Sequence, residues 1–267
     1  MSDLNMKTPN TWCPGCGNFA IQVATKKVIE KIGKDKTVIT GGIGCHAKII
    51  DYVNVNSFYG LHGRPVPVAV GVKLANPELN VIAYSGDGDS LNEGISHLIH
   101  AAKRNSNITV VLHQNRNFAL TVKQYTASSP KGFISNSSPK GNPEEPLNAL
   151  EVVHAAGAGF IARSYTGRMI HLRETLEAAI NHKGFSFVEV LQPCPTWYNT
   201  REEYEEKIYV MRKLPASPLK RIKEWNYDDE GKIALGIFKK EERATFEEEI
   251  EREGEKVDVR GVLNSKI

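Results

Sequence analysis

The sequence predicts an α/β fold in which helices cover both faces of an open, mostly parallel sheet. Residues 81–121 carry the pattern most clearly. An apolar strand at Val81–Tyr84 is followed by apolar residues at the spacing of one helix face, from Leu91 to Ala102, and then by a second strand at Ile108–Leu112. A strand–helix–strand unit of this length is expected to form a right-handed parallel crossover.

Length and composition indicate one large domain with appendages. The chain has 267 residues, of which 40% are hydrophobic, and this is enough to bury a substantial core. The formal net charge of +3 gives no reason to expect nucleic acid as a partner. No apolar run approaches the length of a membrane span, and the N-terminus lacks the form of a signal peptide. We therefore expect a cytoplasmic protein without membrane association.

The first motif along the chain is a Cys-x-x-Cys loop. Cys13 and Cys16 precede a helix that is predicted to run to about Ile32. Four cysteines in a cytosolic chain point to metal or redox chemistry before disulfides. A thioredoxin-like dithiol would follow a strand, and none is predicted here. Structural zinc usually pairs two short clusters, whereas Cys45 and Cys194 are single and distant. Zinc, a [4Fe–4S] cluster and unligated buried thiols all remain open from the spacing.

The next predicted strand runs into a glycine-rich loop. Residues 38–40 lead into Gly41-Gly42-Ile43-Gly44-Cys45, so the third cysteine leaves the end of a buried strand. A turn at residues 60–65 contains His62 and precedes an apolar helix at Val66–Ala75, which Asn76-Pro77 ends. His62 alone is interpreted either as a hydrogen-bonded structural histidine or as a catalytic one.

Polar residues follow both strands of the central crossover. Gly86-Asp87-Gly88-Asp89 ends the first strand, and Gln114-Asn115 ends the second. Open α/β sheets bind ligands at the carboxyl ends of their strands. A carboxylate, an amide and a helix N-terminus at one edge suit Mg²⁺ together with a phosphate group. A lone Gly-Asp-Gly is more often a packing turn, but its separation from Asn115 by residues 89–114 makes the pattern more specific.

Residues 121–147 are rich in Ser, Pro, Gly and Lys and show no periodicity. They are interpreted either as a flexible linker or as a loop that covers a substrate or a partner. The α/β pattern then resumes with alternating helices and strands at residues 148–156, 160–164, 168–181 and 186–191. Asn148 and Glu151 have the spacing of a capping box. Cys194 follows the last strand between two prolines, which suits a ligand held in place.

The composition changes after residue 196. We therefore expect a cofactor-binding domain at residues 1–196 and an irregular, charged C-terminal extension at 197–267. This extension is interpreted either as a solvated tail with one or two charged helices, for instance Glu241–Glu253, or as a segment that packs over a partner subunit. Exposure of many aromatic side chains is costly, so this extension is expected to pack over a partner subunit. The aromatic residues concerned are Trp197, Tyr209, Trp225, Phe238 and Phe246.

Five blocks then support a family resemblance. They are TWCPGCGNFAI, GIGCHAKI, LHGRPVPVAVGVKLANPEL, the unit from Gly86 to Asn115, and FALTVKQYTASSPKG. In this order they resemble the β subunit of the 2-oxoacid:ferredoxin oxidoreductases across residues 9–200, and GIFKKEERATFEEE extends the likeness. The resemblance implies a thiamine-diphosphate-binding domain that also carries Mg²⁺ and one [4Fe–4S] cluster.

The resemblance assigns roles to particular residues. It implies that the cluster is ligated by Cys13, Cys16, Cys45 and Cys194, and that Mg²⁺ is held by Asp87, Asn115 and the main-chain carbonyl of Asn117. The residues expected to bind the thiamine cofactor are Ile43, Gly44, Cys45, His62, Gly86, Asp87, Gly88, Asp89, Asn115, Asn117, Leu120 and Thr121. The residues expected to be catalytic are Lys48, His62 and Lys123, the two lysines as cations for a substrate carboxylate.

Three positions depart from the family pattern. His46 stands where a serine is common, Gln114 where the first of two asparagines is usual, and Val122-Lys123 where a Gly-Gly or Lys-Gly pair is frequent. The departures at His46 and at Val122-Lys123 lie beside the expected active centre; they bear on the choice of substrate and leave the predicted fold unchanged. At Gln114 the neighbouring Asn115, which matches the metal ligand, is kept.

The reaction implied by the resemblance is the coenzyme A-dependent oxidative decarboxylation of a 2-oxoacid to an acyl-CoA and CO₂, with electrons passed through the cluster to ferredoxin. A pyrimidine-binding domain and its catalytic Glu are expected on a partner α subunit, or on α, γ and δ subunits. Two alternatives compete. The diphosphate-binding half of a non-oxidative thiamine decarboxylase or synthase gives the cysteines no role, and a non-catalytic metal scaffold leaves the spacing from Asp87 to Asn115 unexplained.

Overall fold

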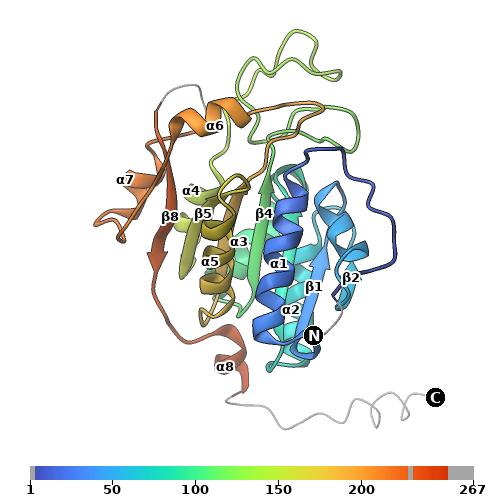
Figure 1. Cartoon of the computed structure of the whole chain (residues 1–267). Coiled ribbons are helices and arrows are strands. Elements are labelled where there is room, and N and C mark those ends of the chain that lie inside the picture. The colour runs from blue at the N-terminus through green and yellow to red at the C-terminus, as the bar shows by residue number, and fades with distance from the viewer. Residues whose placement is uncertain (1–3, 228–230, 252–267) are drawn as a thin grey trace, which may run out of the picture.

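Eight strands form one sheet in the computed structural model, which describes residues 4–227 and 231–251 (Figure 1). The strands are β1 (Thr37–Gly41), β2 (Asn56–Tyr59), β3 (Asn80–Gly86), β4 (Thr109–Gln114), β5 (Phe160–Tyr165), β6 (Ser186–Leu191), β7 (Ile208–Val210) and β8 (Ile233–Lys240). Their order is β2-β1-β3-β4-β6-β5-β8-β7, and every neighbouring pair is parallel except β5 with β8. The predicted open, mostly parallel sheet is confirmed.

Helices cover both faces of this sheet. The helices in chain order are α1 (Asn18–Ile32), α2 (Pro65–Ala75), α3 (Ile95–Arg104), α4 (Ala149–Ala155), α5 (Met169–Ile180), α6 (Arg201–Lys207), α7 (Pro218–Ile222) and α8 (Phe246–Glu251). One buried cluster joins α1 and α5 to one face, and a second joins α2, α3 and α4 to the other. Within the described residues, no helix is long and apolar enough to cross a membrane.

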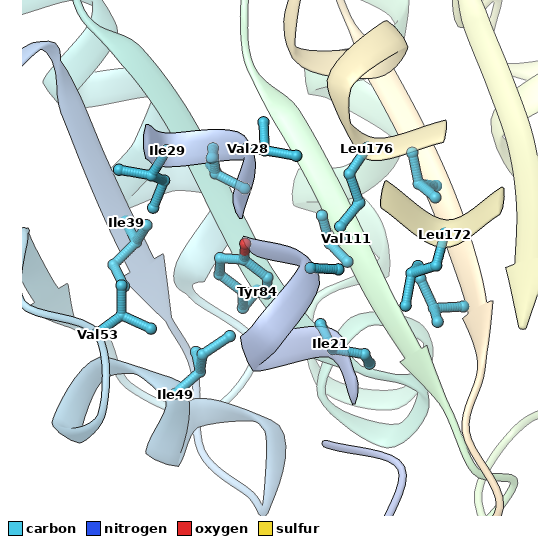
Figure 2. Packing of buried hydrophobic residues seen from close by; sticks show 14 of the residues in the cluster. Ile21, Val28, Ile29, Ile39, Ile49, Val53, Tyr84, Val111, Leu172 and Leu176 are labelled. Atoms are coloured by element: carbon cyan, nitrogen blue, oxygen red, sulfur yellow. The ribbon is translucent and has the colours of Figure 1, made fainter. Parts of the chain in front are cut away.

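The buried cluster between α1 and the sheet places the N-terminus of α1 beside the sheet edge at which the central strands end, the upper edge in Figure 1. Ile21 and Val28 of α1 pack with Leu172 of α5 over the strand residues Val111 and Tyr84, and all five are almost fully buried (Figure 2). Burying an aliphatic side chain of this size stabilises the fold by about 1.5–3 kcal/mol. The Tyr84 hydroxyl is also hydrogen-bonded to Thr25 at 2.7 Å. This packing places the Cys-x-x-Cys loop, directly before α1, over the ends of the central strands.

The central crossover has the predicted strands but an interrupted helix. After β3, residues Gly88–Glu93 form a π-helical turn, and α3 begins only after Gly94. A Cβ atom at Gly94 would lie 2.6 Å from the carbonyl oxygen of Gly63, so the chain passes too closely to another turn for a side chain here. This close approach separates the turn at Asp87 from the regular helix that follows it.

Much of the expected C-terminal extension belongs to the sheet. β8 pairs antiparallel with β5 at the edge, with Ala162 opposite Ile237, and β7 pairs parallel with β8. Trp225 and Phe238 are each 1% exposed and are covered by this chain. The expectation that these two aromatic residues cover a partner subunit is therefore wrong. The sheet also continues past the boundary expected at residue 196. The sequence pattern did not reveal this, because the apolar run Ile233–Phe238 lies between charged clusters.

The predicted helix cap at Asn148 and the predicted C-terminal helix differ in detail from their expectation. The Asn148 side chain accepts hydrogen bonds from the amides of Leu150 and Glu151, as predicted, but the Glu151 carboxylate lies 3.4 Å from Lys223. The C-terminal helix begins at Phe246 and not at Glu241. Thr245 and Glu248 form a capping box there, each donating its amide to the other's side chain. Residues 252–253 of the predicted helix lie outside the described residues.

Candidate active site

Four loops converge at the carboxyl ends of four neighbouring parallel strands. In the sheet register Gly41 lies beside Tyr84, Gly86 beside His113, and Gln114 beside Leu191. The loops that follow β1, β3, β4 and β6 therefore leave the same edge, which is the upper edge in Figure 1. These loops carry Cys45, Asp87, Asn115 and Cys194 respectively.

One cavity at this edge collects every residue that the sequence predicts to bind the thiamine cofactor. All twelve line it, and they are joined by His46, Phe118 and Ala119, which the prediction missed; the full lining is Ile43, Gly44, Cys45, His46, His62, Gly86, Asp87, Gly88, Asp89, Asn115, Asn117, Phe118, Ala119, Leu120 and Thr121. A Cβ atom at Gly88 would lie 2.1 Å from the Phe118 ring, so glycine is required for this approach. That these residues bind the cofactor stays a prediction.

Asp87 is a buried carboxylate without a cationic partner among the described residues. It is 1% exposed, and its Oδ2 atom accepts hydrogen bonds from the hydroxyls of Thr126 at 2.5 Å and Ser128 at 2.9 Å. Burial raises the pKa of Asp87 to about 6, although both hydroxyls oppose this rise. A buried carboxylate that only neutral groups stabilise is a natural ligand for a cation.

Asp89 has a different environment, two residues further on. Its Oδ1 atom accepts hydrogen bonds from the amides of Gly63 at 2.7 Å and Ile43 at 3.2 Å, and its Oδ2 atom accepts one from Ser85 at 2.6 Å. Burial would raise the pKa of Asp89, but the neighbouring His46 ring, Ser85 and the Gly63 amide hold it below its ordinary value. Asp89 is thus satisfied inside the chain and joins the loops after β1 and β3 to the turn at residues 61–64.

Two histidines flank Asp89 on the cavity side. Nδ1 of His62 lies 2.9 Å from Oδ1, and Nε2 of His46 lies 3.3 Å from Oδ2. His46 is 5% exposed, and its ring fills the space that Cβ atoms at Gly44 and Gly86 would need. The imidazole that replaces the common serine therefore separates the cysteine-bearing loop from the turn that carries Asp87.

The two asparagines after β4 form a local turn. Oδ1 of Asn115 accepts hydrogen bonds from the main-chain amide of Asn117 at 3.1 Å and from its side-chain amide at 3.3 Å. Nδ2 of Asn115 donates to Gln192 at 3.3 Å. Oδ1 of Asn117 is buried and has no hydrogen-bond partner among the described residues. The turn thus keeps these asparagines in the wall of the cavity that Asp87 also lines.

A second cavity, of about 220 Å³, is lined by all four cysteines. Its walls also include Trp12, Asn18, Lys48, Gln192 and Trp197. No group of three or more Cys, His, Asp or Glu side chains in residues 4–227 and 231–251 is suited to hold a single metal ion. Burial raises the pKa of Cys16 to about 12 and that of Cys45 to about 11, the latter despite the nearby charge of Lys48.

The two cavities share one wall. Cys45, Asn115, Ala119 and Leu120 line both of them. The backbone at Cys45 is held from the cysteine side, because Nε1 of Trp12 donates to its carbonyl oxygen at 2.6 Å. Gln192 links a cysteine of the second cavity to the shared wall. Its side-chain amide donates to Sγ of Cys16 at 3.5 Å, and its side-chain oxygen accepts a hydrogen bond from Asn115. Gln192 is not among the predicted site residues; its place directly after the strand that precedes Cys194 was the available signal.

The two predicted catalytic lysines do not line the first cavity, which is called the thiamine cavity after its predicted ligand, as the second is called the cysteine cavity. Lys48 lines the cysteine cavity, where Nζ donates to the Thr11 hydroxyl at 2.9 Å. Nζ of Lys123 lies 5.4 Å from the centre of the Phe133 ring. The main chain at Val122 and Lys123 has φ angles of 74° and 71°, a conformation that favours glycine. Of the three predicted catalytic residues, only His62 is brought into the thiamine cavity.

Comparison with known proteins defines the class of this fold and site. Residues 42–190 match the family model of the thiamine pyrophosphate enzyme C-terminal TPP-binding domain. The chain is therefore a thiamine diphosphate enzyme of this domain family, and the matched span runs from the loop after β1 to β6.

Individual relatives narrow the family. The chain is 39% identical over 239 residues to 2-oxoacid:ferredoxin oxidoreductase 1, subunit beta, of Aeropyrum pernix, covering 88% of this chain and 74% of that protein. It is 34% identical to 2-oxoglutarate synthase subunit KorB of Methanothermobacter marburgensis, covering 87% and 83%. The chain belongs to the β subunits of the 2-oxoacid:ferredoxin oxidoreductases, and its function is thiamine-dependent oxidation as part of such an oxidoreductase.

A solved structure shares the fold over nearly the whole chain. The 2-oxoglutarate:ferredoxin oxidoreductase from Magnetococcus marinus, with 2-oxoglutarate, coenzyme A and succinyl-CoA bound, superposes with a TM-score of 0.90 at 27% identity. The match covers 98% of this chain and 94% of that one. The likeness thus includes the C-terminal strands that lie outside the family model.

Proposed function

We propose that this chain binds thiamine diphosphate through Mg²⁺ in one cavity and a [4Fe–4S] cluster in the other. Together with a partner subunit it oxidises a 2-oxoacid to an acyl-CoA and CO₂ and passes the electrons to ferredoxin. The observation that carries this proposal is the shared wall. A cavity lined by glycines and carboxylates and a cavity lined by four cysteines meet at Cys45 and Asn115.

The residues at Asp87 fit a hydrated divalent cation that carries a diphosphate. Mg²⁺ prefers oxygen ligands and usually takes one or two carboxylates together with phosphate oxygens and water. Among the residues that the structure describes, Asp87 offers a buried carboxylate without a cationic partner, and the buried side-chain Oδ1 of Asn117, in the loop after β4, has no hydrogen-bond partner. We assign Asp87, Asn115 and the Asn117 carbonyl as the metal ligands. When bound, the thiamine cofactor supplies the electron sink for decarboxylation.

The four cysteines fit a cluster better than a single zinc ion. Zinc needs four donors at about 2.0–2.3 Å from one atom. The described residues include no group of three such side chains that suits one ion. A [4Fe–4S] cluster takes one thiolate on each of four irons, and its cysteines stand further apart. We assign Cys13, Cys16, Cys45 and Cys194, which line one cavity, as the cluster ligands. Because burial raises the pKa values of Cys16 and Cys45, cluster binding must displace the protons of these two thiols.

The thiamine cavity supports the need for a partner. Its volume is about 60 Å³, whereas pockets that bind drug-sized ligands and cofactors, such as thiamine diphosphate, span about 300–1,000 Å³. Large apolar side chains at its rim are exposed, with Ile43 at 44% and Leu120 at 46%. We infer that an α subunit supplies the opposite wall and the catalytic Glu. A cytoplasmic location is part of the same proposal.

The positions of His62 and Lys48 suggest different roles for these two residues. His62 is 35% exposed at the cavity and is held by Asp89, so it can contact a substrate or cofactor atom from a fixed position. Lys48 lies on the cysteine side, and we infer that it acts near the cluster or on a substrate that reaches across Leu120. The substrate is proposed as a 2-oxoacid, because the relatives are named for 2-oxoacid or 2-oxoglutarate.

Cofactor analysis of the assembled complex under anaerobic conditions tests the proposal. We expect about four irons and one thiamine diphosphate per chain, with the absorption of a [4Fe–4S] cluster. Thiamine without iron would support the non-oxidative decarboxylase or synthase, and metal without thiamine would support a scaffold. A panel of 2-oxoacids with ferredoxin as acceptor then identifies the substrate. Turnover by the isolated chain would refute the required partner.

A further inference from the structure

A continuous set of buried polar contacts leads from Asp87 into the interior of the sheet. The Ser128 hydroxyl lies 2.9 Å from Oδ2 of Asp87 and 2.9 Å from Oε1 of Gln114. Gln114 is the last residue of β4 and donates its side-chain amide to Oε1 of Glu189 on β6 at 3.3 Å. Asp87 is 1% exposed, and the other three residues are 0% exposed.

The inner end of this set is a rigid anchor. Oε2 of Glu189 accepts a hydrogen bond from Nε of Arg163 at 2.5 Å, and Oε1 accepts one from the Tyr227 hydroxyl. The Arg163 guanidinium lies between two aromatic rings, 5.0 Å from the Trp225 ring and 5.5 Å from that of Phe238. A buried ion pair whose remaining donors and acceptors are mostly satisfied has one favoured geometry. Glu189 is therefore a fixed point within the sheet.

The outer end is the loop at residues 121–147. Thr126 and Ser128 both reach Oδ2 of Asp87, and the Ser129 hydroxyl accepts from the Thr126 amide at 2.8 Å and donates to the Arg116 carbonyl at 2.7 Å. The main-chain amide of Ala127 donates to Asn92, next to the turn of Asp87. The start of this loop is thus packed against the carboxylate, contrary to a flexible linker.

We propose that Ser128 and Gln114 are positioning residues for the metal site: they fix the orientation of the Asp87 carboxylate by linking it to the buried Glu189–Arg163 pair. This inference rests on the proposed function, because it takes Asp87 as the metal ligand. Gln114 is the residue that departs from the family's usual asparagine. Its additional methylene lets one side chain contact both Ser128 and Glu189, which an asparagine at the same position is too short to do.

The physical basis is the cost of misorienting a ligand. A cation is held well only when its carboxylate points a lone pair at it, and partners behind the ligand typically change metal affinity by about 10–100-fold when removed. Ser128 carries one hydroxyl proton and faces two acceptors, so its position constrains the side chains of Asp87 and Gln114 together. Thr126, at 2.5 Å, supplies a second donor to the same oxygen.

The test measures Mn²⁺ binding, in place of Mg²⁺, to the assembled complex in the presence of thiamine diphosphate. The variants are Ser128→Ala and Gln114→Asn. The matched control is Ser186→Ala, which removes an equally buried hydroxyl that donates to the Ala179 carbonyl at 2.8 Å, away from the site. We expect about 10–100-fold weaker Mn²⁺ binding in both variants, with an altered Mn²⁺ electron paramagnetic resonance spectrum, and unchanged binding in the control.

The outcomes separate this inference from the proposed function. If the unaltered complex binds no divalent metal with thiamine diphosphate, the metal site itself is refuted, and this inference with it. If the unaltered complex binds Mn²⁺ and both variants bind within twofold of it with the same spectrum, only the positioning role is overturned. Melting temperatures of all variants are measured in parallel. A purely structural role predicts that Ser128→Ala and Ser186→Ala lose affinity in proportion to their loss of stability.

Discussion

The Oδ1 atom of Asp89 lies 2.9 Å from Nδ1 of His62 and accepts a hydrogen bond from the adjacent Gly63 amide at 2.7 Å. One carboxylate oxygen thereby holds both the backbone and the side chain of the turn before α2. A Cβ atom at Gly42 would lie 2.0 Å from the other oxygen, so the loop after β1 also packs directly on Asp89. Asp89 is therefore a structural centre of the site, although the sequence predicts it only as a cofactor contact.

Replacing Asp89 by asparagine keeps its size and removes its charge. Hydrogen bonds to charged groups contribute about 1.5–3 kcal/mol, so we expect Asp89→Asn to lower the free energy of unfolding by about that amount. Chemical denaturation at neutral pH measures this change. Asp51→Asn is the control. Asp51 accepts a hydrogen bond from the hydroxyl of the exposed Tyr59 at 2.7 Å, so this variant should lose much less unfolding free energy. Equal losses in the two variants would contradict the central role of Asp89.

Val122 occupies a backbone conformation that suits glycine. Its φ angle is 74°, and a branched side chain in this region costs about 1–3 kcal/mol. The side chain is 45% exposed, so little packing is lost on its removal. We expect Val122→Gly to raise the free energy of unfolding by about 1 kcal/mol. The same substitution at Val23, which is 48% exposed within α1, should lower it. A loss of stability at both positions would show that Val122 is not strained.

Trp225 tests whether the C-terminal segment belongs to the core of this chain. The side chain is 1% exposed and packs on Tyr227, with ring centres 4.9 Å apart. Replacing a buried tryptophan by alanine costs about 3–5 kcal/mol. We expect this loss for Trp225→Ala in the isolated chain, measured by denaturant unfolding. Trp197→Ala, at the half-buried wall of the cysteine cavity, should cost clearly less. An unaffected isolated chain would restore the view that Trp225 serves a partner.

His182 gives the protein a sensitivity to acid. The ring is 4% exposed, contacts Phe160, and has no hydrogen-bond partner for either nitrogen among the described residues. Burial lowers its pKa, with a further lowering by Lys240 and an opposing effect of Glu242. Because the unfolded chain takes up the proton first, stability is full above the unfolded pKa of about 6.5 and falls as the pH drops from there towards the folded pKa.

The matching measurement is the free energy of unfolding as a function of pH. One such histidine contributes a slope of at most about 1.4 kcal/mol per pH unit. We expect His182→Leu to have a shallower decline below pH 6.5 than the unaltered chain. Identical pH profiles would show that the proton is accommodated in the folded state. Other histidines with lowered pKa values, such as His171, add to the decline in both proteins and cancel in the comparison.

The elements with clear periodicity were predictable from the sequence. Apart from β2, the strands and helices from α1 to β6 follow apolar patterns, and parallel strands bring their carboxyl ends to one edge. The twelve cavity residues were named in advance by the family resemblance. β2 was missed because it is a mostly exposed edge strand with no apolar alternation. β8 was missed because it lies between charged clusters and pairs with β5, about seventy residues earlier in the chain.

The directions in which the side chains of the site point could not be predicted from the sequence pattern. Lys48 follows Cys45 closely, but a 3₁₀ turn at His46–Asp51 directs it to the cysteine cavity. The contacts of Gln114 with Ser128 and Glu189 depend on a loop and a neighbouring strand that meet only in the folded chain. The block containing Thr126 and Ser128 was part of the family likeness, yet nothing in its composition indicates that two hydroxyls reach Asp87.

One support behind Gln114, Tyr227, follows the strands of the site in the chain. Tyr227 contacts Glu189 and also accepts, through its carbonyl, a hydrogen bond from Arg116 across 111 positions of the chain. A nascent chain that has emerged only as far as β6 has both strands of the site but lacks this backing. Domains fold as units, so the edge that carries Asp87 should reach its final geometry only after Tyr227 and β8 have joined the sheet. The order of the site is therefore completed by a segment that follows all of its lining residues in the chain.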